Sequence, residues 1–130
     1  MTTTLTNVGW KEVLPAQAAS STATGSAVDM QGYAHGRRRL KGIVVCLPTG
    51  ADANETCDVK LQESDTTTSG DFADITGATF TQILQPGGAK SEEISFTLKK
   101  RYIRAIATLA GTTPTFTLGV GVLAPKSQTP

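Results

Sequence analysis

The sequence has little of the chemistry that marks an enzyme or a metalloprotein. It contains one histidine, His35, and two cysteines, Cys46 and Cys57. A structural zinc site needs about four ligands of these types, so we expect no metal and no cofactor. No nucleophile motif surrounds a serine, and there is no Walker A or dinucleotide-binding motif. We therefore expect no enzymatic activity, with His35 in a loop between two glycines and without a catalytic role.

An excess of one charge and long apolar runs are also missing. Twelve Lys and Arg balance eleven Asp and Glu, for a formal net charge of +1, whereas nucleic-acid-binding domains are usually strongly basic. No stretch approaches the roughly 18 apolar residues of a membrane span, and the N-terminus does not resemble a secretory signal. We expect neither nucleic acid nor a membrane as a partner. Cys46 and Cys57 lie in apolar segments, which favours free buried thiols made in a reducing cytoplasm and leaves a later disulfide open.

Threonine and glycine take the place of aromatic and charged residues. The 130 residues include 21 Thr and 13 Gly but only seven aromatic side chains. Threonine suits strands and turns better than helices. Short apolar or alternating runs separated by turn residues cover 27–30, 40–47, 58–63, 80–84, 94–98, 102–109 and 116–123. We therefore expect an all-β fold, an antiparallel two-sheet β-sandwich or jelly roll of about seven or eight strands.

Several details of this sandwich follow from the same pattern. The continuous apolar run 40–47 predicts a fully buried central strand, and alternation in 58–63 places Val59 and Leu61 on one face. The turn residues 111–114 predict that 102–109 and 116–123 form an antiparallel hairpin. Residues 71–75 fit either a helical turn or a short strand. Gly119 and Gly121 leave two side chains missing from one face, which predicts a close-packed neighbour or a bulge.

Domain boundaries are expected near both ends. Residues 1–25 lack a sustained apolar period and predict an extended N-terminal arm, followed by the β-sandwich over 26–124 and a polar tail over 125–130. Trp10 is the exception within the arm. It either folds back to cover one end of the core or anchors the arm on a neighbouring subunit.

The charged residues are segregated along the chain. One basic cluster contains Arg37, Arg38 and Arg39, and a second contains Lys99, Lys100 and Arg101. Both mark the beginnings of expected strands, so we expect them at similar ends of the sandwich. Residues 52–74 carry seven acidic side chains and one lysine, and Asp65 and Asp71 there are expected to be solvent-exposed without binding a metal. We favour electrostatic docking between protein surfaces over simple solvation of these charges, and we expect the chain to form oligomers.

Four segments together resemble a known family. Val59-Lys-Leu-Gln-Glu-Ser-Asp65 followed by Asp71-Phe-Ala-Asp-Ile75, and Phe96-Thr-Leu-Lys-Lys-Arg-Tyr-Ile-Arg104 followed by Gly111-Thr-Thr-Pro-Thr-Phe116, are similar to stretches of small tailed-phage structural proteins. The resemblance covers about residues 26–124 and points to the head decoration, or capsid cement, proteins.

This resemblance implies a non-enzymatic virion protein, made in the cytoplasm of the bacterial host, that binds the outside of the mature capsid and stabilises it. It implies the major capsid protein as a partner and self-association, commonly as a homotrimer. Candidate contact residues for the capsid or other subunits are Trp10, Arg37, Arg38, Arg39, Lys99, Lys100 and Arg101. The alternative is a carbohydrate- or receptor-binding β-sandwich of a phage tail or fibre. Sugar-binding platforms usually expose two or more aromatic side chains, and only Trp10 and Tyr33 lie outside the expected strands and the 71–72 turn.

Overall fold

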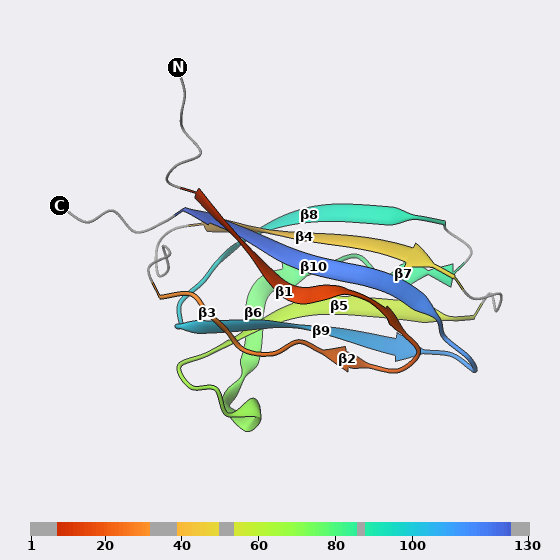
Figure 1. The fold of residues 1–130 in the computed structure, drawn as a ribbon, viewed down its shortest axis with the longest axis horizontal. Helices are drawn as coiled ribbons and strands as arrows, with labels where there is room; N and C mark the ends of the chain where they lie inside the picture. The colour runs from red at the N-terminus through yellow and green to blue at the C-terminus, as the bar shows by residue number, and fades with distance from the viewer. Residues whose placement is uncertain (1–7, 32–38, 50–53, 86–87, 126–130) are drawn as a thin grey trace, which may run out of the picture.

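The computed structural model describes residues 8–31, 39–49, 54–85 and 88–125. It confirms an all-β fold of two antiparallel sheets (Figure 1). Sheet A contains, in order, β1 (Val8–Ala19), β10 (Phe116–Pro125), β4 (Arg39–Pro48) and β8 (Lys90–Thr97). The centre of sheet B is the pair β9 (Tyr102–Ala110) and β5 (Thr56–Ser64). On the free side of β9 lie β2 (Ala23–Thr24) and β3 (Val28–Asp29). On the free side of β5 lie β6 (Ala73–Thr79) and β7 (Ile83–Leu84).

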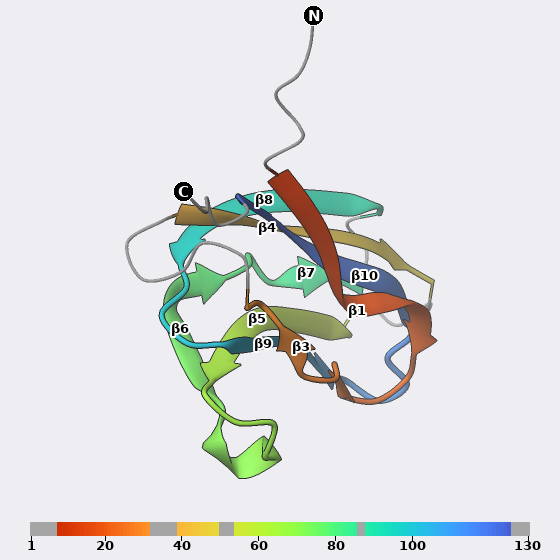
Figure 2. The ribbon, with the colours of Figure 1, turned by 60° about the vertical axis from the view of Figure 1, so that its left-hand side comes forward.

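The strand order is that of a jelly roll. β2 and β3 share one position beside β9, and β6 and β7 share one beside β5, so the ten strands fill eight positions. The chain passes from one sheet to the other at six of the nine connections between these strands, and the connections β2–β3, β5–β6 and β6–β7 stay within sheet B. Figure 2 shows the resulting two layers, with β8, β4, β10 and β1 above β5, β9 and β3. The expected sandwich of seven or eight strands is confirmed.

The expected hairpin between 102–109 and 116–123 is wrong. Both segments are strands, but β9 lies in sheet B and β10 in sheet A. The connection crosses between the layers because Gly111, at a φ of 122°, turns the chain against Glu55 at the start of β5. Thr113 Oγ1 then donates a hydrogen bond of 3.1 Å to Glu55 Oε2. Turn residues alone do not distinguish such a crossing from a hairpin.

The expected boundary between an arm at 1–25 and a sandwich starting at 26 is also wrong for the residues that the structure describes. β1 pairs antiparallel with β10 from Val8 to Ala19, and β2 joins sheet B. Val13 and Leu14 are both buried although they are neighbours in the chain, because the register shifts on either side of Leu14. Such bulges remove the regular apolar period that would have identified a strand. Residues 1–7 and 126–130 are not described.

Small residues in this segment serve close packing. Gly25 is buried and donates its backbone N–H to Ala105 O at 2.8 Å. A Cβ at position 25 would collide with the backbone oxygen of Val13. At this position the small residue is required by the close approach of the backbones of Val13 and Ala105.

The core lies between the sheets. Its largest fully buried side chains include Phe96, Phe116, Leu14, Met30 and Leu40. Val59 and Leu61 are fully buried on one face of β5, as predicted, and Cys46 and Cys57 are free and buried. Residues 71–75 combine both expected conformations, because a 3-10 turn over Ser69–Asp71 precedes β6. Among the described residues there is no helix with the length and apolar character needed to span a bilayer.

Candidate functional site

Strand β4 exposes one of its two faces, which corrects the expectation of a fully buried strand. Leu40, Val44 and Cys46 point into the core, whereas Val45 and Leu47 point outward with 60% and 49% of their surface exposed. The outward positions face solvent because sheet A forms an outer layer of the sandwich, with sheet B covering only its inner face. The apolar side chains of residues 40–47 therefore lie on both faces of sheet A, some in the core and some on the outer surface.

The exposed apolar side chains of sheet A border a trough over β10. Gly119 and Gly121 of β10 are the register partners of Val45 and Ile43 of β4. Because they are glycines, β10 has no side chains at the two positions next to these β4 side chains. On the other side, β1 approaches the glycines. We call this hollow the sheet A trough. It has a volume of about 400 Å³, and its lining includes Trp10, Glu12, Ala16, Ile43, Val45, Leu47, Thr117, Gly119 and Gly121.

Trp10 closes one end of the trough. It stands on β1 opposite Leu123 of β10, and its indole lies over Gly121, where a Cβ would overlap the ring. Ala16 packs in the same way against Gly119, with its Cα 3.2 Å from where a Cβ would be. The expected close-packed neighbour of the two glycines is therefore β1 of the same chain. The interpretation that Trp10 covers the end of the core is wrong, because the ring lies on the outer face of sheet A and is 51% exposed.

The outer face of sheet B has a different character, because its polar side chains satisfy one another. Asp74 accepts hydrogen bonds from Gln62 Nε2 at 2.7 Å and Lys60 Nζ at 3.0 Å, and these two contacts hold the pKa of its carboxyl below the usual value. Gln62 Oε1 in turn accepts from Arg104 Nε at 2.9 Å. The Arg104 guanidinium lies 4.3 Å from the ring centroid of Phe72 and donates to Ser69. This face therefore presents a connected polar network.

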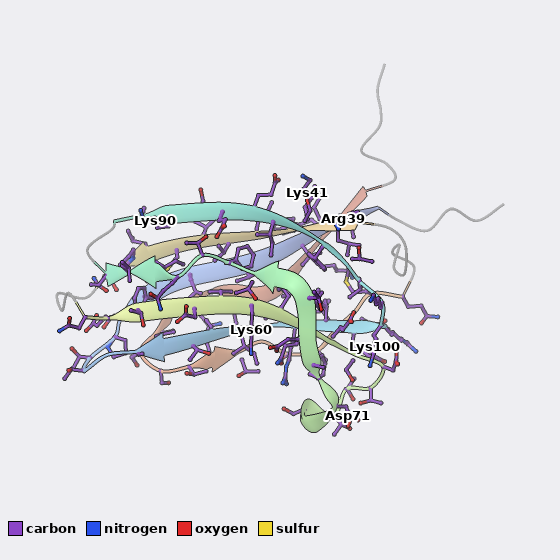
Figure 3. All side chains as sticks on the ribbon, turned by 180° about the vertical axis from the view of Figure 1, so that it is seen from behind. Arg39, Lys41, Lys60, Asp71, Lys90 and Lys100 are labelled. Carbon is purple, nitrogen blue, oxygen red and sulfur yellow. The ribbon has the colours of Figure 1, made fainter. Side chains whose placement is uncertain are left out.

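Arg39, the described residue of the first basic cluster, lies toward the same end of the sandwich as the second cluster. Figure 3 shows Arg39 and Lys100 toward the same end of the sandwich, with Lys90 at the other end. Arg39 and Lys99 line one cleft of about 350 Å³ together with Glu63 and Asp74. Glu63 Oε1 accepts the backbone N–H of Lys99 at 2.8 Å, and Arg39 Nη2 donates to Ser95 O at 3.3 Å. The charges in this cleft balance one another. Arg37 and Arg38, together with His35 and Tyr33, lie outside the described residues.

Arg101 already has a partner within the chain. Its Nε and Nη2 donate to the two carboxylate oxygens of Asp29 at 3.0 and 2.8 Å, tying β3 to the start of β9. The hydrogen bond with Arg101 lowers the pKa of Asp29 to about 2, with the backbone N–H of Gln31 as a second cause. Arg101 is therefore a structural contact, in contrast to Lys99 and Lys100, whose ammonium groups form no ion pair with another described residue.

The acidic segment divides into buried and exposed groups. Asp65 and Asp71 are exposed, as predicted. Glu55 is fully buried, with Oε2 bonded to Thr113 and Oε1 without a hydrogen-bond partner. In the described part of the chain, no three His, Cys, Asp or Glu side chains gather as a metal site.

The two thiols meet in the core between the sheets. Cys46 comes from β4 of sheet A and Cys57 from β5 of sheet B, and both are essentially inaccessible to solvent. A hydrogen bond with Cys46, together with burial, raises the pKa of the Cys57 thiol. A protonated, buried thiol is a poor nucleophile, so Cys57 is unreactive in the folded chain. Both side chains are inaccessible to solvent and act as core packing.

Sequence reasoning missed the outward residues of β4. Ile43, Val45 and Leu47 recur at every second position, which is the period of one strand face, but Leu40, Val44 and Cys46 fill the alternate positions and hide it. The paired glycines at 119 and 121 were the available signal, since they mark the strand that forms the floor of the trough.

Comparison with known proteins shows the fold alone. No protein-family profile matches the chain, and no curated protein matches it either. The chain is similar to the crystal structure of the SPBc2 prophage-derived protein YomS, with a TM-score of 0.52, 12% identity, and coverage of 95% of this chain and 99% of that one. It is less similar to the CBM22-1 xylan-binding domain of Paenibacillus barcinonensis Xyn10C, with a TM-score of 0.48, 9% identity, and coverage of 92% and 88%.

Proposed function

We propose that this chain is a structural protein of a bacteriophage particle that docks on the outside of the capsid and stabilises it, without enzymatic activity. The observation that carries the proposal is the contrast between the two outer faces. Sheet A presents half-exposed Trp10, Val45 and Leu47 around an apolar trough, whereas the polar side chains of sheet B bond to one another. Apolar side chains grouped around a hollow favour a protein contact.

Two further observations agree with this proposal. The fold is shared with a prophage-derived protein, and the segments around 59–75 and 96–116 resemble tailed-phage structural proteins. A decoration protein needs complementary surface rather than a reactive group. Many copies on one shell add their modest contacts, because each bound copy must be detached before the shell can expand or break. The host cytoplasm is then the site of synthesis and the capsid exterior the final location.

We propose the major capsid protein and further copies of this chain as partners, with a homotrimer as the assembled form. Lys99, Lys100 and Arg39 lie at one end of the sandwich and are the described basic residues placed to meet acidic surfaces of these partners. Light scattering on the purified chain at micromolar concentration tests the self-association. A trimer is expected, and a strict monomer contradicts this part of the proposal.

The alternative, a carbohydrate- or receptor-binding module, draws on the exposed indole of Trp10, because sugars stack on aromatic rings. The trough offers few polar groups beside that ring. Glu12 and Thr117 are the polar side chains among its lining residues, and the β4 side of the trough is aliphatic. Sugar sites combine a stacking ring with several convergent hydrogen-bonding groups. A glycan array therefore serves as the second arm of the test, and specific binding to a glycan with no binding to capsids would favour the alternative.

The decisive experiment measures binding to heads purified from a phage strain that lacks the gene. Wild-type chain is expected to bind these heads and to raise the temperature at which they release DNA. Leu47→Glu places a carboxylate beside the trough and is expected to weaken binding at least about tenfold, equivalent to about 1.4 kcal/mol. Leu84→Glu is the matched control, because Leu84 is exposed to nearly the same extent, 47% against 49%, but belongs to sheet B. Equal binding by both variants, or none by the wild type, contradicts the proposal.

A further inference from the structure

Glu12 is the one carboxylate among the described residues that line the trough. Glu12 follows Trp10 by two residues on β1, so both side chains stand on the same face and border the trough. Glu12 is the register partner of Gly121, the glycine that the Trp10 indole covers. The carboxylate is exposed, and no described residue pairs with it. The other charged side chains on this face have partners: Lys41 Nζ lies 3.5 Å from Glu93 Oε1, and Arg39 Nη2 donates to Ser95 O at 3.3 Å.

The position of Glu12 restricts what can cover the trough. A partner that buries Val45, Leu47 and the exposed part of Trp10 also removes water from the neighbouring carboxylate. Burying a carboxylate without a partner is costly, and an apolar surface alone would therefore be excluded at this end of the trough. A partner with a basic side chain satisfies the carboxylate and contributes binding at the same time.

We propose that the trough receives an extended segment of a partner protein in which a basic side chain, arginine above all, is flanked by aliphatic side chains. This inference rests on the proposed function and names the chemistry that the partner presents to sheet A. The guanidinium stacks on the free face of the Trp10 indole and pairs with Glu12, while the aliphatic side chains contact Val45 and Leu47. Arginine suits this corner better than lysine, because its planar group both stacks on a ring and bonds a carboxylate through two N–H groups.

The dimensions of the trough agree with an extended segment. Its floor follows β10 from Thr117 to Gly121, which at about 3.3 Å per residue gives a length of about 13 Å, or four residues of extended chain. Trp10 and Ala16 of β1 fill the space over Gly121 and Gly119, so the segment lies beside these two side chains along the trough rather than directly on the backbone of β10. The side chains of β4 then form a wall along the length of the segment.

The experiment uses the fluorescence of Trp10, which is the single tryptophan of the chain. The probe is a short blocked peptide with one central arginine between valines, and the comparison peptides carry glutamine or glutamate in place of the arginine. The arginine peptide is expected to change the emission of Trp10 with a dissociation constant in roughly the millimolar range, at least about tenfold lower than that of the glutamine peptide. The difference is expected to shrink as salt is added.

Two variants separate the carboxylate from the rest of the face. Glu12→Gln is expected to remove the preference for arginine, whereas Glu93→Gln, on the same face but outside the trough, is expected to keep it. Equal affinity for all three peptides, no binding at millimolar concentration, or an unchanged preference in Glu12→Gln would overturn the inference. The peptide measurements need no phage heads, so the two experiments can fail independently. A negative peptide result would overturn this inference without changing the measured binding to heads. A failure to bind heads would contradict the proposed function without changing the peptide result.

Discussion

The indole of Trp10 occupies the space above Gly121 that a side chain at that position would need. We expect Gly121→Ala to destabilise the fold by about 1–3 kcal/mol, because the new methyl group overlaps the ring and displaces either Trp10 or β1. Trp10→Ala removes the obstacle, so the double variant Trp10→Ala/Gly121→Ala is expected to be more stable than the sum of the two single changes predicts. Chemical denaturation of the four proteins measures this coupling.

Gly70→Ala provides the control for the glycine substitution. No atom lies within 4 Å of a Cβ built at Gly70, so this change is expected to leave the free energy of unfolding nearly unchanged. A cost for Gly121→Ala that is no larger than that of Gly70→Ala would show that Trp10 does not rest on Gly121.

The ion pair between Asp29 and Arg101 predicts a dependence of stability on acid pH. The pKa of Asp29 is lowered from 3.8 to about 2 in the folded chain. A lowered folded-state pKa contributes stability that is fully present above 3.8 and is lost as the pH falls toward 2. We expect Asp29→Asn to be less stable than the wild type at neutral pH, and the difference to disappear near pH 2. Thermal unfolding across this range checks it.

Asp65→Asn is the matched control for this experiment, because Asp65 is exposed and its side chain forms no hydrogen bond or ion pair with another described residue. Its unfolding midpoint is expected to follow that of the wild type over the whole range. A difference between Asp29→Asn and the wild type that stays constant from neutral pH to pH 2 would contradict the role of the ion pair.

Among the described residues, Thr113 is the one whose side chain hydrogen-bonds the buried carboxyl group of Glu55. Thr113 Oγ1 donates the hydrogen bond to Oε2 where the chain crosses from sheet B to sheet A. Thr113→Val keeps the shape of the side chain and removes the donor, so we expect a loss of about 1–3 kcal/mol. Thr112→Val is the control, since Thr112 is the exposed preceding residue. Equal stability of the two variants in urea would show that the Glu55 contact contributes nothing.

Cys46 and Cys57 are expected to resist thiol reagents in the folded protein. Both are buried and face one another across the core, and the raised pKa of Cys57 keeps its thiol protonated. A colourimetric thiol assay is expected to detect no free thiol in the native chain and two after unfolding. Rapid reaction of either cysteine without denaturant would mean that the sheets separate readily at this end.

Much of the fold was predictable from local pattern. Strands such as β5 and β9 alternate, and alternation identifies a strand whatever it pairs with. Three features were not predictable for a common reason, namely that they depend on pairing between distant segments. β1 is bulged at Leu14, β9 and β10 separate into different sheets, and Val45 is exposed only because β4 belongs to an outer layer.

The candidate site was only partly visible in the sequence for a similar reason. The prediction that Gly119 and Gly121 meet a close neighbour is confirmed, and the neighbour is β1. Neither the glycines nor Trp10 indicate a trough until the register places Val45 opposite Gly119 and the Trp10 indole lies over Gly121. The roles proposed for Lys99 and Lys100 in docking stay predictions.

The central place of β10 between β1 and β4 has a consequence for biosynthesis. β10 follows every other described strand along the chain, and β1 pairs with it from Val8↔Pro125 to Ala19↔Phe116. β1 therefore stays without its partner strand during translation until more than 90 further residues have been added. Sheet B has all of its strands once Ala110 has emerged, so it is the half that can form first during translation. Nascent chains arrested before Phe116 are therefore expected to be cut readily by protease within β1 and β4, and to become protected only when the final strand emerges.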